Sequence, residues 1–289
     1  MIINDWGLFE VTRERVDFVK VHGIKNDPEI LTKVLPYGTP TGRAVKHLSI
    51  EGKVYFSYID MSSEVGKGLV FCFDRDQINL NLMDLLPTME NLVADPNQLD
   101  GPLTCDPQPR NPKPIKTKNF DSAVFAFLAR LTTIVVGEEE EIFDLIYSVS
   151  AVVPPDMRLR LEFVTHSTSL SENVKIIGMP LSDEVLGELE GDRGSYTFIF
   201  PEDRVYGQYS SKISQKIANL VKKGDYDKVG HELEELYNIV RMTDELPPAL
   251  ELKDQFGIHL SDAQLILVMR ANYFGKPVPD GLLGGGTSA

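Results

Sequence analysis

The sequence predicts an α+β fold in which an N-terminal antiparallel sheet with flanking helices precedes a second α/β layer and a C-terminal helical subdomain. Three observations predict this fold. Short segments rich in β-branched and aromatic residues dominate the first 73 residues. A proline-rich stretch interrupts the chain at 95–118. Strand-like runs then alternate with helical spacing, and helical spacing alone remains after residue 209.

Composition restricts the classes of function. The 289 residues suffice for about two domains. The net charge of −14 disfavours nucleic-acid and anionic-lipid partners. Two cysteines do not make a disulfide framework, and neither a signal peptide nor an apolar span of membrane length is evident. We therefore expect a cytoplasmic protein without membrane insertion, while its oligomeric state is not specified.

The N-terminal part is predicted to contain strands, one short helix and one longer helix. The strand between 54 and 59 has large side chains on both faces, which is typical of a central strand covered on both sides. Asp76 is expected to cap the longer helix, which Pro87 would kink. The other predictions are strands at 9–13, 16–22, 44–50 and 69–73, a helix at 28–35 and a turn at 51–52.

The stretch 95–118 contains six of the 18 prolines and few bulky apolar residues, which predicts an extended connector. We therefore divide the chain into five segments. They are an antiparallel α+β domain at 1–94, a linker at 95–118, an α/β domain at 119–208, a helical subdomain at 209–280 and a disordered tail at 281–289.

After the linker, a buried helix is predicted at 120–136, with a strand at 134–136 as an alternative ending. Ser210 or Ser211, Asp225 and Ser261 are expected to cap the three C-terminal helices. The remaining predictions are helices at 138–152 and 182–189 and strands at 161–165, 174–179 and 196–200.

One candidate anion-binding loop consists of Gly38, Thr41, Gly42 and Arg43. Backbone N–H groups of a glycine-rich loop can surround an anion, and an arginine can pair with it. The loop lacks the spacing of a nucleotide-binding P-loop, and Pro40 removes one donor. An ordinary turn between a helix and a strand is the favoured interpretation.

A second candidate loop, Thr165-His166-Ser167-Thr168-Ser169, follows a predicted strand. Loops in that position often form active sites, but a polar turn is favoured because no orienting carboxylate is evident. The carboxylates of 138–141 match the start of a helix better than a cation site. The five histidines show no metal-ligand spacing, so we predict no metal site and no cofactor.

Two passages carry a resemblance to known families. Lys53-Val-Tyr-Phe-Ser-Tyr-Ile-Asp60 and Gly68-Leu-Val-Phe-Cys-Phe-Asp74, followed by a helix, resemble a longin-type layer. The helix–Pro–Arg–strand passage at 142–166 is similar to passages of DENN-type modules. This resemblance implies a regulator associated with a small GTPase. It matches no signature residue, so it assigns no catalytic or binding residue.

Two functions are therefore expected. The first is a non-enzymatic protein-interaction or regulatory protein whose partner is another protein, such as a small GTPase. The alternative is an enzyme or nucleotide-binding protein with a site assembled from loops 38–43 and 165–169.

Overall fold

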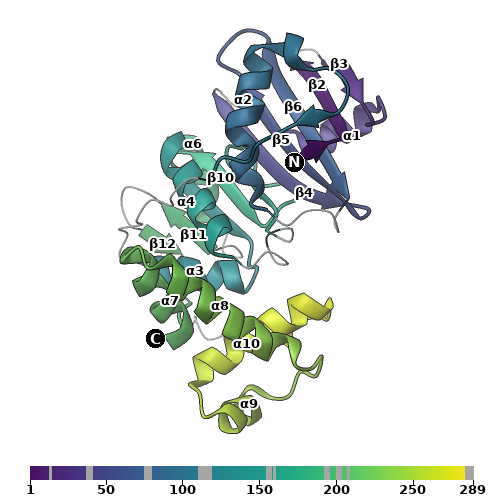
Figure 1. The fold of residues 1–289 in the computed structure, drawn as a ribbon. Coiled ribbons are helices and arrows are strands. Elements are labelled where there is room, and N and C mark those ends of the chain that lie inside the picture. The colour runs from purple at the N-terminus through teal and green to yellow at the C-terminus, as the bar shows by residue number, and fades with distance from the viewer. Residues whose placement is uncertain are drawn as a thin grey trace. The chain divides into compact units, whose positions relative to one another are not determined.

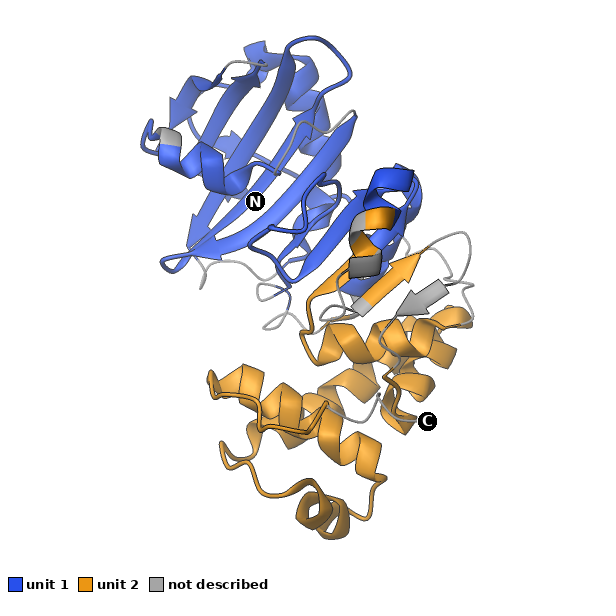
Figure 2. Cartoon of the chain, turned by 180° about the vertical axis from the view of Figure 1, so that it is seen from behind, with its two compact units in different colours: residues 1–112, 135–151, 155–186 blue, residues 113–134, 152–154, 187–289 orange. Residues whose placement is uncertain are grey.

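The structure, a computed structural model, describes residues 1–12, 15–36, 42–74, 80–109, 119–153, 158, 161–191, 196–199, 204–206 and 209–283. The chain forms two compact units (Figure 2). Unit 1 comprises 1–112, 135–151 and 155–186, and unit 2 comprises 113–134, 152–154 and 187–289.

The predicted α+β class is confirmed, because helices accompany a large mixed sheet and a small antiparallel sheet (Figure 1). The strands with residues in unit 1 are β1 (Ile2–Ile3), β2 (Asp5–Val11), β3 (Val16–His22), β4 (Arg43–Ile50), β5 (Lys53–Asp60), β6 (Gly66–Asp74), β7 (Leu103–Thr104), β8 (Thr133–Gly137), β9 (Phe163–Val164) and β10 (Ile176–Pro180). Their order in the large sheet is β8-β10-β9-β4-β5-β6-β2-β3, and β1 pairs with β7 in the small sheet. β10 and β9 are parallel, whereas β9, β4, β5, β6, β2 and β3 pair antiparallel in turn.

Helices cover both faces of the sheet in unit 1 (Figures 1 and 2). The helices with residues in this unit are α1 (Pro28–Val34), η2 (Leu82–Leu85), α2 (Leu86–Ala94), η3 (Pro96–Gln98), α4 (Glu139–Val152) and α6 (Asp183–Gly191). Ser57 of β5 donates a hydrogen bond to the Val34 carbonyl of α1 at 2.6 Å, while α2 packs on β5 and β6 from the other side. Both faces of β5 are therefore buried, as its bulky side chains predict.

The β4–β5 hairpin forms as the sequence predicts. Ile50 pairs with Lys53, which leaves a two-residue loop of Glu51 and Gly52. Both loop residues have positive φ, 51° and 81°, which is typical of the turn whose twist matches that of the strands. The hairpin fixes the register of β4 and therefore the face on which each of its side chains lies.

Unit 2 is mainly helical. Its elements are α3 (Phe120–Leu128), β11 (Tyr196–Ile199), β12 (Arg204–Tyr206), α7 (Lys212–Lys222), α8 (Tyr226–Arg241), α9 (Ala249–Phe256) and α10 (Leu260–Phe274). α10 is buried nearly all round, as its apolar sequence predicts. Its buried Arg270 donates hydrogen bonds to the carbonyls of Ile239 at 3.0 Å and Glu245 at 3.1 Å, which fixes the end of α8.

Several predicted boundaries are wrong. The helix expected at 120–136 ends at Leu128, because Arg130 adopts a positive φ of 51° that a helix does not continue through, and the alternative of a strand at 134–136 is confirmed by β8. The expected longer helix is divided into η2, which ends at Leu85, and α2, so Pro87 lies in the first turn of α2, where no N–H is needed. The N-cap of α10 is His259 and not Ser261. The predicted Asp76 cap lies outside the described residues, and α9 was not predicted.

Part of the expected linker packs onto unit 1. Leu99, Leu103 and Cys105 are buried, the Trp6 indole donates to the Gly101 carbonyl at 2.9 Å, and β7 pairs with β1. Residues 110–118 lie outside the described residues, as do 284–289 of the expected tail, and the domain boundaries drawn from the sequence stay a prediction.

Cys72 and Cys105 are free, buried thiols. Within the described chain, no helix combines the length and the apolar character that crossing a bilayer requires.

A buried ion pair joins β4 to the loop before β10. The Lys46 ammonium lies 2.7 Å from a carboxylate oxygen of Glu172, and their side chains are 1% and 0% exposed. Lys46 also donates to the Leu35 carbonyl at 2.8 Å, which follows α1. Removing one member of such a pair leaves a charge without compensation in a medium of low dielectric constant.

We predict that Lys46→Met lowers the free energy of unfolding by about 3–5 kcal/mol, because the Glu172 carboxylate then stays buried without its counter-charge. The matched control is Lys53→Met, which removes the half-exposed 2.6 Å pair with Asp74 and should cost about 1 kcal/mol or less. Denaturant unfolding measures both values. Equal losses in the two variants would contradict the argument.

Candidate functional site

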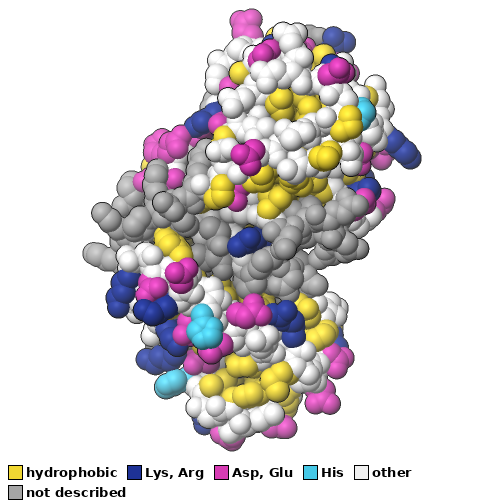
Figure 3. Space-filling model, in the orientation of Figure 1, with side chains coloured by type: hydrophobic (Ala, Val, Ile, Leu, Met, Phe, Trp, Pro, Cys, Tyr) yellow, Lys and Arg dark blue, Asp and Glu magenta, His cyan; other side chains and the backbone are white. Residues whose placement is uncertain are grey.

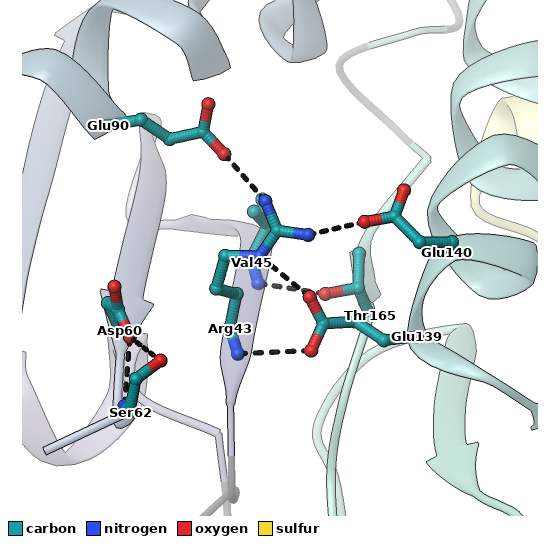
Figure 4. Close-up of polar contacts among 8 residues, drawn as sticks. All are labelled: Arg43, Val45, Asp60, Ser62, Glu90, Glu139, Glu140 and Thr165. Carbon is teal, nitrogen blue, oxygen red and sulfur yellow. Dashed lines mark hydrogen bonds and ion pairs between the residues drawn. The ribbon is translucent and has the colours of Figure 1, made fainter.

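Arg43, the first residue of β4, lies at the centre of a cluster of three carboxylates (Figure 4). Its Nε donates to Glu139 at 2.7 Å, and its two terminal nitrogens donate to Glu140 at 2.5 Å and to Glu90 at 3.3 Å. Its guanidinium carbon also lies 5.7 Å from the ring centroid of Phe143. We call Arg43, Glu90, Glu139 and Glu140 the Arg43 cluster.

The three carboxylates come from two helices. Glu139 and Glu140 lie in the first turn of α4, where acidic side chains complement the positive end of the helix dipole. Glu141 in the same turn accepts a hydrogen bond from the Glu138 N–H at 3.1 Å, as a helix cap does. Glu90 lies on α2. The acidic run thus starts the helix, as its position predicts, and two of its members also hold Arg43.

The electrostatics of the cluster favour a permanently charged arginine. Burial lowers the pKa of Arg43, but the hydrogen bonds and charges of Glu139 and Glu140 outweigh burial and raise the pKa above its ordinary value. Burial raises the pKa of the nearby Tyr58 phenol, and the charges of Asp60 and Glu90 raise it further. The negative field of the carboxylates therefore exceeds the positive field of Arg43 at this place.

These contacts determine what the cluster can bind. One guanidinium and three carboxylates carry a net charge of −2, so a further anion would be repelled. Among the residues that the structure describes, no group of three or more His, Cys, Asp or Glu side chains has an arrangement that would hold a metal ion. The contacts of the Arg43 cluster are structural, because they hold β4, α2 and α4 together.

The described part of the predicted anion loop is Gly42 and Arg43, whereas Gly38 and Thr41 lie outside the described residues. Gly42 has φ +131°, and a Cβ atom there would lie 2.7 Å from Glu139 Oε2. A side chain at this position would therefore be strained and would crowd the carboxylate that pairs with Arg43. Arg43 itself pairs with side chains of the protein.

The second predicted loop begins beside β4. The Val45 N–H donates to the Thr165 hydroxyl at 2.8 Å, and the Thr165 N–H donates to the Val45 carbonyl at 2.8 Å (Figure 4). The Thr165 carbonyl lies against Gly178 of β10, where a Cβ atom would have no room. The fold thus brings the start of the second loop beside Val45, which lies two residues after the first loop and 120 residues before Thr165.

The His166 and Ser167 side chains of this loop are enclosed. His166 is buried, and its Nδ1 atom has no hydrogen-bond partner among the described residues. Burial lowers the pKa of His166, although the charge of Glu139 acts to raise it. Ser167 is fully buried, and its hydroxyl donates to the Ser169 carbonyl at 3.1 Å. A hydroxyl in this position does not face a substrate.

A separate open pocket of about 400 Å³ lies beside α1. Its lining combines lysines with carboxylates, so it presents both signs of charge, and no local sequence pattern predicts it. Cys72 lines it, but burial raises the pKa of its thiol, although the Tyr55 hydroxyl acts in the opposite direction. The thiol is therefore not activated as a nucleophile.

Comparisons with family models and with curated proteins find no match to this chain. The resemblance to longin and DENN modules therefore stays a prediction.

We predict that Arg43→Gln and Glu139→Gln each lower the free energy of unfolding by about 1–2 kcal/mol, because both pairs are partly exposed. In a double-mutant cycle their coupling should exceed about 0.5 kcal/mol. Salt should stabilise Arg43→Gln relative to the native chain, because it screens the repulsion among the remaining carboxylates.

The control for this experiment is Arg15→Gln, which breaks the exposed 3.0 Å pair with Asp17 and should change stability by less than about 1 kcal/mol. Denaturant unfolding at low and high salt gives all the values. The structural role of the Arg43 cluster would be contradicted if the losses of unfolding free energy in the two single variants were additive and salt affected Arg43→Gln and the native chain equally.

Proposed function

We propose that this chain is a non-enzymatic protein-interaction or regulatory protein, and that the stretch from Met242 to Leu260 is its docking surface. The observation that carries the proposal is the exposure of large apolar side chains there. Met242 is 68% exposed, Leu250 62% and Leu260 41%. Hydrophobic side chains gather over α9 in Figure 3. A gathering of this kind is typical of a protein-binding surface.

Hydrogen bonds and an ion pair hold the stretch 242–260 to the rest of unit 2. Arg270 holds the Glu245 carbonyl, and the Lys276 ammonium lies 2.7 Å from an Asp244 carboxylate oxygen. Within α9 itself, Leu252 is the buried residue. The helix therefore has one side anchored in unit 2 while Leu250 faces outward, and a partner meets a surface that is already formed.

The charges around the surface favour a basic partner. Residues 242–260 contain four carboxylates, those of Asp244, Glu245, Glu251 and Asp254, and one lysine, Lys253, for a net charge of −3. Complementary charge on a partner increases the association rate and selects among candidate proteins. We therefore propose a partner with apolar anchors bordered by Lys or Arg. The resemblance described above makes a small GTPase the first class to test.

We predict that Met242→Ser together with Leu250→Ser weakens partner binding at least tenfold, because two exposed anchors are lost. The partner is first captured from native lysate with the full chain and identified, and its Kd is then measured with purified proteins. High salt should weaken binding if the carboxylates of residues 242–260 pair with basic residues of the partner. The matched control is Ile2→Ser with Val19→Ser, which changes two similarly exposed apolar side chains of unit 1.

A partner whose Kd is unchanged by the first pair and raised by the control pair would move the docking surface to unit 1. Turnover of a small molecule by the purified chain, with no specific protein partner, would overturn the proposed function itself.

A second candidate function is supported by the hydrogen bond that joins Val45, two residues after loop 38–43, to Thr165, the first residue of loop 165–169. A ligand bound between the ends of loops 38–43 and 165–169 would contact both. Arg43 does not favour an anion there, because its donors already meet carboxylates.

We predict that, if this candidate function is real, one member of a panel of nucleotides and divalent metals stabilises the chain by about 2.7 kcal/mol at 100 times its Kd. Thermal unfolding with each ligand measures the effect. Thr165→Val should abolish the shift, whereas Thr243→Val, an exchange outside the loops, should preserve it. A panel without any shift would remove the support for this candidate.

A further inference from the structure

One face of β4 carries polar side chains at two separate positions. Side chains alternate along a strand, so Arg43, Val45 and His47 lie on the same face. Arg43 belongs to the cluster described above. His47, about 13 Å further along at the usual rise per residue, lines a small cavity in unit 1.

Three residues that line this cavity each carry a buried polar atom without a hydrogen-bond partner among the residues that the structure describes. The atoms are Nε2 of His47, Nδ2 of Asn81 and Oγ of Ser150. The three residues are 2%, 6% and 4% exposed. They belong to β4, to the cap of η2 and to α4. Buried polar atoms without partners are rare in folded proteins, because each costs about 1–3 kcal/mol.

The neighbouring hydrogen bonds fix what each atom needs. Nδ1 of His47 lies 2.9 Å from the Leu161 carbonyl, which can only accept, so Nδ1 carries the proton. Burial lowers the pKa of His47 to about 4, so the ring is neutral at pH 7 and Nε2 is an acceptor. Oδ1 of Asn81 accepts from the Met83 N–H at 3.1 Å, so the amide nitrogen is the free donor. The Ser150 hydroxyl can donate or accept.

We infer that this cavity binds one internal water molecule, which donates to His47 Nε2, accepts from Asn81 Nδ2 and completes its set with Ser150 Oγ. The cavity leaves about 10 Å³ for the centre of a water molecule, which is about the minimum that holds one. Two to four polar partners are usual for a buried water.

The donor and acceptor set selects water over ions of similar size. An ammonium ion has no lone pair for the Asn81 amide, and a chloride ion has no proton for His47 Nε2. Arg158 is a lining residue as well, and its positive charge further disfavours a cation. Water is therefore the species that satisfies all three atoms.

The bound water would join β4 to α4, as the Arg43 cluster does. Arg43 ties the start of β4 to α2 and to the first turn of α4, and the water ties His47 to the cap before η2 and to the last turns of α4. Between them, the Tyr147 hydroxyl of α4 donates to the Asp84 carboxylate of η2 at 3.0 Å. The polar contacts thus extend along α4 from its first turn to Ser150.

A high-resolution crystal structure of the full chain tests the inference. We expect one density peak within about 3.2 Å of all three atoms. ¹⁵N NMR should show His47 protonated at Nδ1 and not at Nε2 at neutral pH, and water should transfer magnetisation to the Asn81 side-chain amide. An empty cavity, an ion with anomalous scattering at the site, or a proton on Nε2 would each overturn the inference.

Two variants at one position provide the matched control. Ser150→Val places methyl groups in the cavity, so the density peak and the magnetisation transfer should both be lost. Ser150→Ala adds no volume and leaves two partners, so the peak should remain. Retention of the peak in Ser150→Val would show that the water lies elsewhere and would overturn the site.

Discussion

The alternation of side chains along β4 is the constraint on which the rest of unit 1 depends. One face of this strand sends Lys46 into a buried pair with Glu172 and a hydrogen bond with the Leu35 carbonyl. The other face sends Arg43 and His47 toward α2 and α4. A shift of one residue in register would exchange these faces, so Lys46 would lose its counter-charge and Arg43 its three carboxylates. The Glu51-Gly52 turn prevents that shift because its length fixes the pairing of β4 with β5.

The polar contacts of β4 reach segments that are distant in the sequence. Glu139 and Glu172 follow β4 by about a hundred residues, yet both meet charged side chains of this one strand. Such pairs give less net stability than their Coulomb attraction suggests, because desolvation opposes it. Their main effect is specificity: an alternative packing of α4 on the sheet would leave charges without partners. The charged pairs therefore specify the position of α4 on the sheet more precisely than apolar packing alone would.

Local patterns in the sequence predicted the elements of unit 1 well, because alternation and turn residues act over a few positions. The pattern around Gly42 and Arg43 also marked a place of importance, but it suggested an anion. The carboxylates that pair with Arg43 come from Glu90 and from the acidic run at 138–141, and no local spacing connects them. α9 was not predicted because it spans eight residues after two prolines and buries one leucine, which leaves little apolar periodicity. The Ser261 cap failed because the chain enters α10 two residues earlier, at His259.

The two candidate sites differ in whether their side chains already have partners within the protein. The polar groups near the Arg43 cluster have such partners, whereas the apolar side chains of the proposed docking surface are exposed. A catalytic centre needs groups that meet a substrate, such as a base with a free lone pair or a hydroxyl beside it. At the Arg43 cluster the guanidinium donors meet carboxylates, and the Ser167 hydroxyl donates to a carbonyl inside the protein. Met242 and Leu250 are the opposite case, because their side chains remain in water although burial would stabilise each by about 1.5–3 kcal/mol. The proposed docking surface of unit 2 therefore has apolar area whose burial would contribute free energy to binding, whereas the polar groups of β4 pair within unit 1.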